Sequence, residues 1–275
     1  MLRSKFFMSG IIIVLMLVLS ILFLPMIIPF EPQAMDISAR LLPPDGLSKG
    51  LEGHILGTDA LGRDMLVRLL VGGRLSFMIA VISVVGSGLI GTIFGVLSGY
   101  MGRKVDTLIM RISDIQLAIN VTLLAIVVVA VMGNSVVNLI LVMIITSWVR
   151  FTRIVRSEVL FIKTKEFVQA SVVLGGSKLH IMFNQILPNV TTSLIVMLSQ
   201  TFGFVILVEA SLSFLSMGIP ITEPSWGGMI AEGRDYLATA PWVVVVPGLA
   251  LMFTVLAFNF LGDGIRDILD PKMKH

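Results

Sequence analysis

The amino-acid sequence predicts an all-α membrane protein with six transmembrane helices. Of its 275 residues, 56% are hydrophobic and only 13% are charged, whereas about 25% of the residues of a soluble protein are charged. That balance leaves too little polar surface to cover a water-soluble body of this size. The apolar residues also fall in continuous runs of about 20 residues, the length that a helix needs to cross a bilayer. These runs do not alternate in polarity, as the strands of a membrane β-barrel would.

The composition excludes other classes of protein. A disordered chain would be less hydrophobic, a collagen would show a Gly-X-Y period, and a disulfide scaffold would need cysteines, of which this chain has none. The basic pI of about 9.4 reflects unequal charge between loops, so no nucleic-acid partner is expected. The three histidines are far apart in the sequence, so no metal site is expected.

Six spans follow from the uncharged runs. The first follows Arg3 and Lys5 and is too long for a signal peptide, with no A-x-A-like cleavage site after it; we interpret residues 1–30 as a retained membrane anchor. The third and fourth spans share one uncharged run, which Gly133-Asn134 divides in the manner of a tight turn. The expected spans are 8–29, 75–99, 112–132, 136–152, 190–214 and 241–262.

The distribution of basic residues predicts the orientation. If the N-terminus is cytoplasmic, 14 of the 20 Lys and Arg residues lie inside and six lie outside, as the positive-inside rule requires. Both termini are then cytoplasmic. The expected regions are the extracytoplasmic segment 31–74, the membrane core 75–262 with the cytoplasmic loop 152–189, and the tail 263–275.

The second span carries small residues four positions apart, namely Ser87, Gly91, Gly95 and Gly99. They fall on one helix face, where small side chains let a neighbouring backbone approach closely. We therefore expect another helix to pack on this face.

The cytoplasmic loop 152–189 is the most informative stretch. Phe167, Ala170 and Leu174 have the spacing of an amphipathic helix, and Gly175-Gly176 predicts its end, because glycine accepts a left-handed backbone. Pro188 lies at the expected start of the fifth span. Before it lies a second apolar face, which consists of Leu179, Met182, Phe183 and Ile186. The helix pair either rests on lipid headgroups or docks a cytosolic partner.

Polar residues within or beside the spans are candidates for function. Glu209 and Asn259 either mark a polar pathway through the membrane or its gate, or make structural hydrogen bonds between helices. Outside the membrane, Asp59 and Asp64, with Arg63 and Arg68, either cap a helix that leads into the second span or form a surface for an extracytoplasmic partner.

The loop resembles the EAA loop of ABC-importer permeases. The triplet is Gln169-Ala170-Ser171, the glycine is Gly175, and Leu187-Pro188 close the motif; Glu166, Phe167 and Leu174 belong to the same element. Gln169 replaces the usual glutamate of that family, and Gln185 stands where isoleucine is frequent.

The rest of the chain resembles the peptide/nickel permeases of the DppC/OppC type. The segment 54–64 matches H-x-L-G-T-D-x-x-G-R-D through Gly57, Thr58, Asp59, Gly62, Arg63 and Asp64. Further similar stretches are 209–215, 224–227, 259–267 and 270–271, whereas Asn120 stands where proline is frequent after the R-x-x-D element of Arg111 and Asp114.

The resemblance implies a type I ABC-importer permease in a bacterial or archaeal inner membrane. Its implied partners are a second homologous permease, two cytoplasmic ATPase subunits that carry ATP and Mg, and an extracytoplasmic solute-binding protein. The chain has no G-x-x-x-x-G-K-[ST] motif, so we expect neither ATP hydrolysis nor a cofactor in it. The implied activity is import of peptides or of nickel and metal chelates by alternating access, and no residue decides between these substrates.

Two other functions agree less well with the sequence. A secondary transporter or channel acting alone often needs several buried ionisable groups, and the spans offer mainly Glu209. An intramembrane enzyme is disfavoured because H-E-x-x-H is absent and no serine stands beside a credible base.

Overall fold

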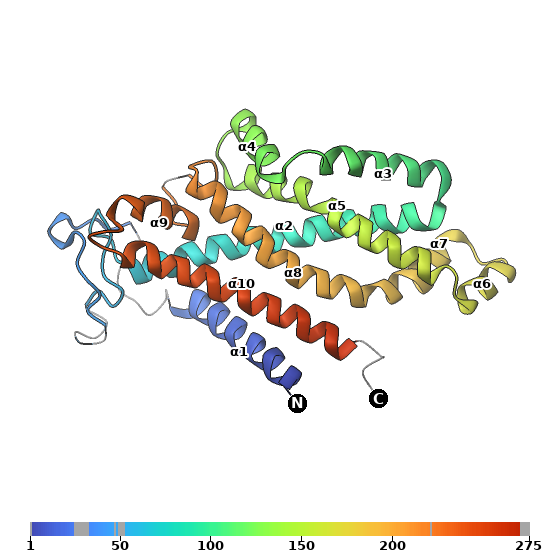
Figure 1. Ribbon diagram of the computed structural model, residues 1–275, viewed down its shortest axis with the longest axis horizontal. Coiled ribbons are helices and arrows are strands. Elements are labelled where there is room, and N and C mark those ends of the chain that lie inside the picture. The colour runs from blue at the N-terminus through green and yellow to red at the C-terminus, as the bar shows by residue number, and fades with distance from the viewer. Residues whose placement is uncertain (1, 25–32, 47, 49–52, 221, 270–275) are drawn as a thin grey trace.

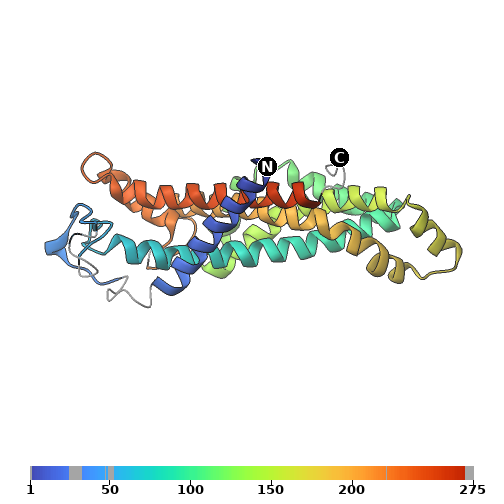
Figure 2. The same ribbon diagram turned by 90° about the horizontal axis from the view of Figure 1, so that it is seen from below.

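The computed structural model is an elongated bundle of helices (Figure 1). It describes residues 2–24, 33–46, 48, 53–220 and 222–269. Helices α2, α5, α8 and α10 run along the length of the bundle, and α1 crosses it obliquely and packs on α10 (Figure 2). We name the two ends of the bundle after the short helices there, the α9 end and the α6 end. The elements are α1 (Leu2–Phe23), η2 (Ile37–Ala39), α2 (Met65–Met101), α3 (Arg103–Leu117), α4 (Val121–Met132), α5 (Val136–Ile162), α6 (Glu166–Val173), α7 (Lys178–Ile181), η4 (Met182–Ile186), α8 (Leu187–Phe214), α9 (Trp226–Gly233), η5 (Arg234–Tyr236) and α10 (Trp242–Leu269).

The predicted all-helical class is confirmed within the described ranges, where the only strand-like pairing is an isolated bridge between Thr58 and Asp64. Four helices there are long and apolar enough to span a membrane, and the bent pair α3–α4 makes up to five. The apolar part of α1, Phe7–Phe23, is shorter than these. The end of the predicted first span and the last six residues of the tail lie outside the described residues.

The third span is not the single helix that we predicted over residues 112–132. Helix α3 ends at Leu117, α4 begins at Val121, and their axes differ by 87°. Asn120 causes the restart, because its side chain accepts hydrogen bonds from the backbone N–H groups of Thr122 and Leu123 at the first turn of α4.

Three other spans are longer than predicted. Helix α2 begins at Met65 rather than at residue 75, because the Asp64 side chain accepts a hydrogen bond from the Val67 N–H and caps it there. Helix α5 continues to Ile162 rather than ending at residue 152, and α10 continues to Leu269. The charged residues that end the uncharged runs lie inside these helices, so the length of an uncharged run underestimates the length of its helix.

The small-residue stripe of α2 lies directly against α5. A Cβ atom built on Gly91 would lie 2.4 Å from the Phe151 Cβ, and one on Gly95 would lie 2.6 Å from the Val155 Cβ. Gly99 faces Val159 in the same way, and Ser87, one turn before Gly91, is fully buried. The two helix backbones therefore approach at distances that only glycine permits.

We expect Gly95→Ala to destabilise the protein, because the added methyl group would collide with α5. The cost is of the order of 1–3 kcal/mol, and it would appear as a lower midpoint of thermal unfolding of the purified protein. Gly248→Ala is the matched control, since nothing lies within 4 Å of a Cβ at Gly248 in α10. There alanine should be neutral or stabilising, because it favours helix more than glycine does. Equal midpoints for the two variants would contradict the close contact.

Candidate functional site

The predicted loop forms a helical hairpin at the α6 end. Helix α6 ends at Val173, and Gly175 takes a left-handed backbone with φ +81°, so the predicted helix stop is confirmed. The Gly176 N–H donates to the Ser171 carbonyl at 2.9 Å, which closes the turn. The Ser177 side chain then caps α7 by accepting from the His180 N–H.

Pro188 lies in the first turn of α8, as predicted, but no break in the helical chain precedes it. The chain is helical without interruption from Lys178 to Phe214. A π-helical turn, η4, precedes the proline. Because proline has no N–H and its ring crowds the carbonyl four residues before it, a wider turn at this point accommodates it.

A small separate core holds the hairpin to the bundle. Val168 of α6, Ile181 of α7 and Ile186 of η4 are almost completely buried against Val155 and Val159 of α5. Outside that core, the Gln169 side chain donates to the Lys163 carbonyl at 2.8 Å, and Lys163 Nζ donates to the Tyr100 carbonyl. The hairpin is therefore fixed to α5 and to the end of α2.

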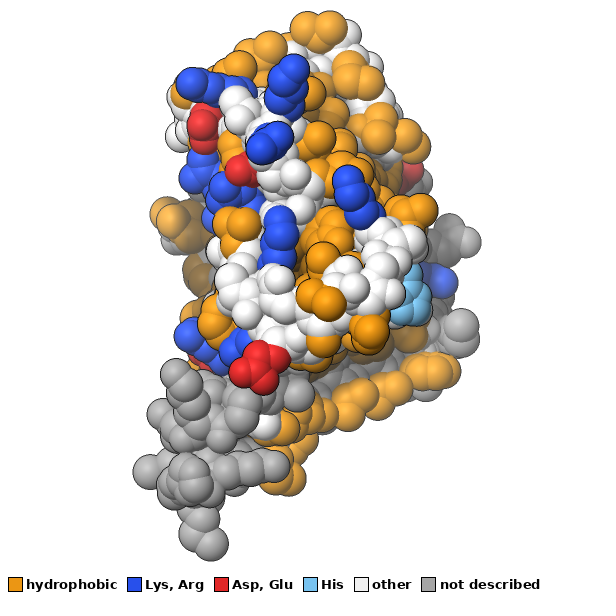
Figure 3. Space-filling view, turned by 90° about the vertical axis from the view of Figure 1, so that its right-hand side faces the viewer, with side chains coloured by type: hydrophobic (Ala, Val, Ile, Leu, Met, Phe, Trp, Pro, Cys, Tyr) orange, Lys and Arg blue, Asp and Glu red, His pale blue; other side chains and the backbone are white. Residues whose placement is uncertain are grey.

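The predicted apolar face of α6 does not pack on the bundle. Phe167 and Leu174 are 48% and 86% exposed, and Ala170 is exposed as well. The neighbouring Val173, outside the predicted face, is 85% exposed, whereas Val168 is buried. The remaining coupling-loop candidates Glu166 and Gln169 are exposed, and Ser171 is half-buried. Seen end-on, the α6 end presents hydrophobic side chains beside a gathering of Lys and Arg (Figure 3). Exposed apolar residues of this kind mark a contact surface.

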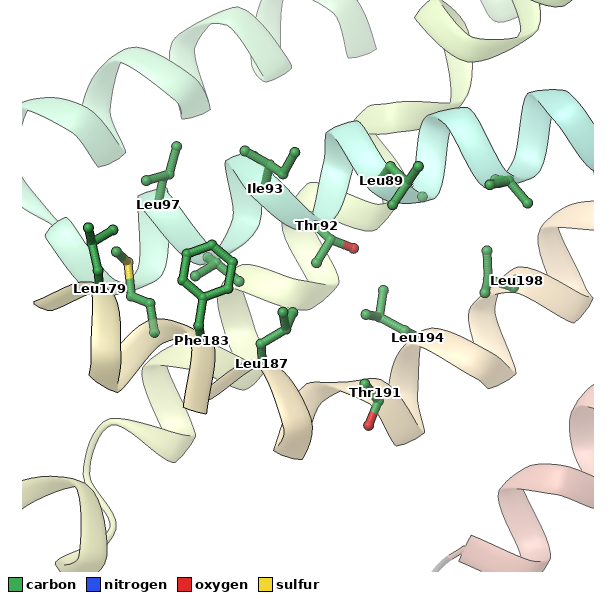
Figure 4. A pocket seen from close by; sticks show the side chains of 14 residues that line it. Leu89, Thr92, Ile93, Leu97, Leu179, Phe183, Leu187, Thr191, Leu194 and Leu198 are labelled. Carbon is green, nitrogen blue, oxygen red and sulfur yellow. The ribbon is translucent and has the colours of Figure 1, made fainter. Parts of the chain in front are cut away.

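An apolar groove runs from the hairpin along α2. It has a volume of about 550 Å³, and Leu179, Phe183 and Leu187 face Leu89 and Ile93 across it (Figure 4). The exposed part of the second predicted apolar face, Leu179 and Phe183, thus lines this groove, whereas Met182 and Ile186 are buried in the small core.

At the α9 end, the segment 57–64 forms a tight loop before α2. Gly57 and Gly62 both have positive φ, +77° and +75°, and a Cβ at Gly62 would overlap the Asp36 carbonyl. Thr58 Oγ1 donates to the Ala39 carbonyl and accepts from the Leu42 N–H, so it holds the preceding loop. Asp64 caps α2 itself, rather than the separate short helix that we considered.

Four charged side chains meet beside this loop in a cluster that is buried except for Glu232, which is 30% exposed. Arg63 Nε donates to Asp59 at 2.6 Å, and Arg63 also pairs with Glu232 of α9. Arg68, which is 3% exposed, pairs with both Asp59 and Glu232. Sequence reasoning missed Glu232, because more than 160 residues separate it from its partners and no local pattern marks it.

The two intramembrane candidates lie apart from both of these regions. Glu209 is 0% exposed in α8, and its Oε1 accepts a hydrogen bond from Ser213 Oγ at 2.8 Å. In this conformation it lines no exposed surface. Asn259 of α10 is half-buried, and its Oδ1 lies 3.8 Å from where a Cβ on Gly203 of α8 would be.

Ion pairs join α3 to α5. Asp106 accepts from Arg156 at 2.6 and 2.8 Å and from Ser98 of α2, and Asp114 pairs with Arg153. The polar side of α3 thus faces the second half of α5.

Comparisons with known proteins agree over nearly the whole chain. Residues 91–275 match the family model described as "Binding-protein-dependent transport system inner membrane component", and residues 1–44 match "N-terminal TM domain of oligopeptide transport permease C". The chain is 40% identical to a di/tripeptide transport system permease protein of Pseudomonas aeruginosa, over 99% of this chain and 90% of that one. It is 37% identical to an oligopeptide transport system permease protein of Bacillus subtilis, over 98% and 87%.

Proposed function

Because the chain belongs to the family of binding-protein-dependent transport system inner membrane components, we propose that it is a membrane-spanning permease subunit of an ATP-driven peptide importer. The observation that carries this proposal is the hairpin at the α6 end, which is fixed to the bundle yet exposes the apolar residues Phe167, Val173 and Leu174. Such a surface suits a partner that must push on the membrane helices. The protein is an inner-membrane component with several membrane-spanning helices.

In the proposed arrangement, the α6 end is cytoplasmic and the hairpin docks on one of two ATPase subunits, which carry ATP and Mg. A second homologous permease completes the membrane part, and an extracytoplasmic solute-binding protein delivers solute to the α9 end. We place six spans in this chain, with α1 as the first and the bent pair α3–α4 as the third, and both termini on the cytoplasmic side. ATP hydrolysis is assigned to the partner subunits and none to this chain.

The proposed mechanism is alternating access. Movement of the ATPase subunits would displace the hairpin, and α8 would transmit that displacement, since α7, η4 and α8 form one uninterrupted helical rod. Asn259 is our candidate for a side chain that lines the path. Glu209, whose carboxyl group is completely buried, is assigned a hydrogen-bonding role within the packed helices.

For the substrate we propose peptides rather than nickel or metal chelates. The similar proteins from Pseudomonas aeruginosa, Alkalihalophilus pseudofirmus and Bacillus subtilis are named as permeases for dipeptides, tripeptides or oligopeptides. A channel or secondary transporter that works alone is the alternative function, and it needs no ATPase partner.

Growth on a peptide tests the proposed function. A leucine-requiring host that lacks its own peptide importers receives the complete transporter genes, with or without this chain. We expect growth on a leucine-containing dipeptide only when the chain is present, and equal growth on free leucine in both strains. Peptide-dependent growth without the chain would refute its role in import. Nickel accumulation that depends on the chain, with no peptide growth, would replace peptides by nickel as the substrate.

A further inference from the structure

Helix α5 carries three arginines in its second half, and they differ in their partners. Arg153 and Arg156 each pair with a carboxylate of α3, at 2.5 and 2.6 Å. In the described part of the chain, no carboxylate lies within ion-pair distance of Arg150. Its guanidinium carbon instead lies 4.0 Å from the centre of the Phe204 ring of α8.

The position of Arg150 along α5 makes this charge costly. It comes 14 residues after Val136, the first residue of α5, which corresponds to about 21 Å along the helix axis. Counted from Val136 as the outer boundary of the membrane, that depth lies within the roughly 30 Å of hydrocarbon in a bilayer. A charge there faces protein or a water-filled cavity, yet the Arg150 side chain is exposed on the surface of this chain. Lipid tails are therefore an unfavourable environment for this side chain.

One face of α5 is buried before Arg150 and exposed from Arg150 onward. Leu139, Met143 and Thr146 share this face and are buried in the main core. The next residues on it, Ile154 and Ser157, are exposed, and they follow Arg150 toward the α6 end. Along this face of α5 toward the α6 end, Arg150 is thus the first exposed residue after the buried residues Leu139, Met143 and Thr146.

The neighbouring helices α8 and α10 carry polar side chains near this face of α5. One turn from Phe204 toward the α6 end, Gln200 of α8 is exposed, and its side chain donates to Asp263 of α10 at 3.5 Å. Asn259 lies one turn before Asp263 on α10. Beside Arg150 of α5, α8 and α10 therefore contribute the exposed polar side chains of Gln200 and Asp263, with the half-buried Asn259 next to them.

The chemistry of Arg150 selects its ligand. A guanidinium group has five N–H donors in a planar fork that matches a carboxylate, and it stays charged. The Phe204 ring covers the guanidinium group on one side, and N–H donors on its other sides can reach a ligand. A peptide in transit carries one carboxylate at its C-terminus, whereas its N-terminal ammonium group would be repelled.

We propose that Arg150 lines a water-filled translocation path and binds the C-terminal carboxylate of the transported peptide. The peptide part of this inference rests on the proposed function. The first half of the proposal is that water reaches the face of α5 that carries Arg150 and that this face attracts anions. It can be tested without any peptide.

The cysteine-free sequence allows a direct test in the assembled transporter. Ile154→Cys places one thiol a turn from Arg150, and its labelling rate is measured with anionic sulfonatoethyl and cationic trimethylammonium-ethyl methanethiosulfonate. We expect both reagents to react, and Arg150→Met to lower the anionic-to-cationic rate ratio about tenfold. Ile145→Cys is the matched control, since Ile145 and Ile154 are 46% and 42% exposed on different faces of α5; it should react slowly with both reagents.

Two results would overturn the first half. If Ile154→Cys is as unreactive as Ile145→Cys, lipid or a partner chain covers this face. If Arg150→Met leaves the ratio unchanged, Arg150 does not set the local potential.

The second half is tested by protection of the same thiol. Dialanine should slow the labelling of Ile154→Cys by about threefold or more, and dialanine amide, which lacks the carboxylate, should not. Arg150→Lys should keep part of the protection, and Arg150→Met should lose it. Lack of protection by dialanine, with the effect of Arg150 on labelling intact, would overturn the peptide assignment. The growth experiment then decides separately whether the chain serves peptide import.

Discussion

Arg68→Met should destabilise the α9 end strongly. Arg68 is 3% exposed and pairs with Asp59, which is 2% exposed, and with Glu232. Its removal leaves Arg63 as the only cation to balance two carboxylates, and breaking a buried ion pair in this way costs about 3–5 kcal/mol. We expect a clearly lower midpoint of thermal unfolding and faster proteolysis of the segment before α2.

The control for this variant is Arg234→Met. Arg234 also forms an ion pair, with Asp235 at 3.4 Å, but both side chains are largely exposed, at 63% and 76%. An exposed pair contributes about 0–1 kcal/mol, so this variant should unfold close to the wild type. Equal behaviour of the two variants would contradict the view that the buried cluster holds α2 to α9.

Gly175→Arg should uncouple transport from ATP hydrolysis. The residue has φ +81°, and a non-glycine residue in this conformation costs about 1–2 kcal/mol. Nothing lies within 4 Å of a Cβ at this position, so the side chain itself fits. We expect the strain to shift the exposed tip of α6 and to reduce transport by about tenfold, while the transporter still assembles.

Gly46→Arg separates backbone strain from coupling. Gly46 has φ +60° and an equally open surrounding, but it lies in the segment before α2, far from the hairpin in the chain. This variant should carry a similar strain with normal transport. Full transport by an assembled Gly175→Arg transporter would refute the role of this glycine in coupling.

Local chemistry made several features predictable from the sequence. The helix stop at Gly175 follows from the conformational freedom of glycine, and the contact at Gly91 and Gly95 follows from spacing on one helix face. The fold class follows from the uncharged runs. Each of these depends on residues close together in the sequence, where periodicity and turn chemistry carry information.

Features that depend on distant residues were not predictable. A hydropathy run cannot show that Asn120 restarts the helix, because a bend of 87° leaves the hydrophobicity unchanged. The partnership of Arg68 with Glu232 joins two helices far apart in the sequence. The count of basic residues places Arg150 simply on the cytoplasmic side, whereas its contact with Phe204 and the exposed face of α5 beyond it show its surroundings in the bundle.

Uptake by reconstituted vesicles tests the central claim most directly. The permease pair is placed in liposomes with the ATPase subunits and ATP on one side and the loaded binding protein on the other, and entry of radiolabelled dialanine is measured. We predict uptake from the complete system, and only background when the ATPase subunits are left out. Undiminished uptake without those subunits would show that the membrane chains transport alone, which contradicts a permease driven through the α6 hairpin.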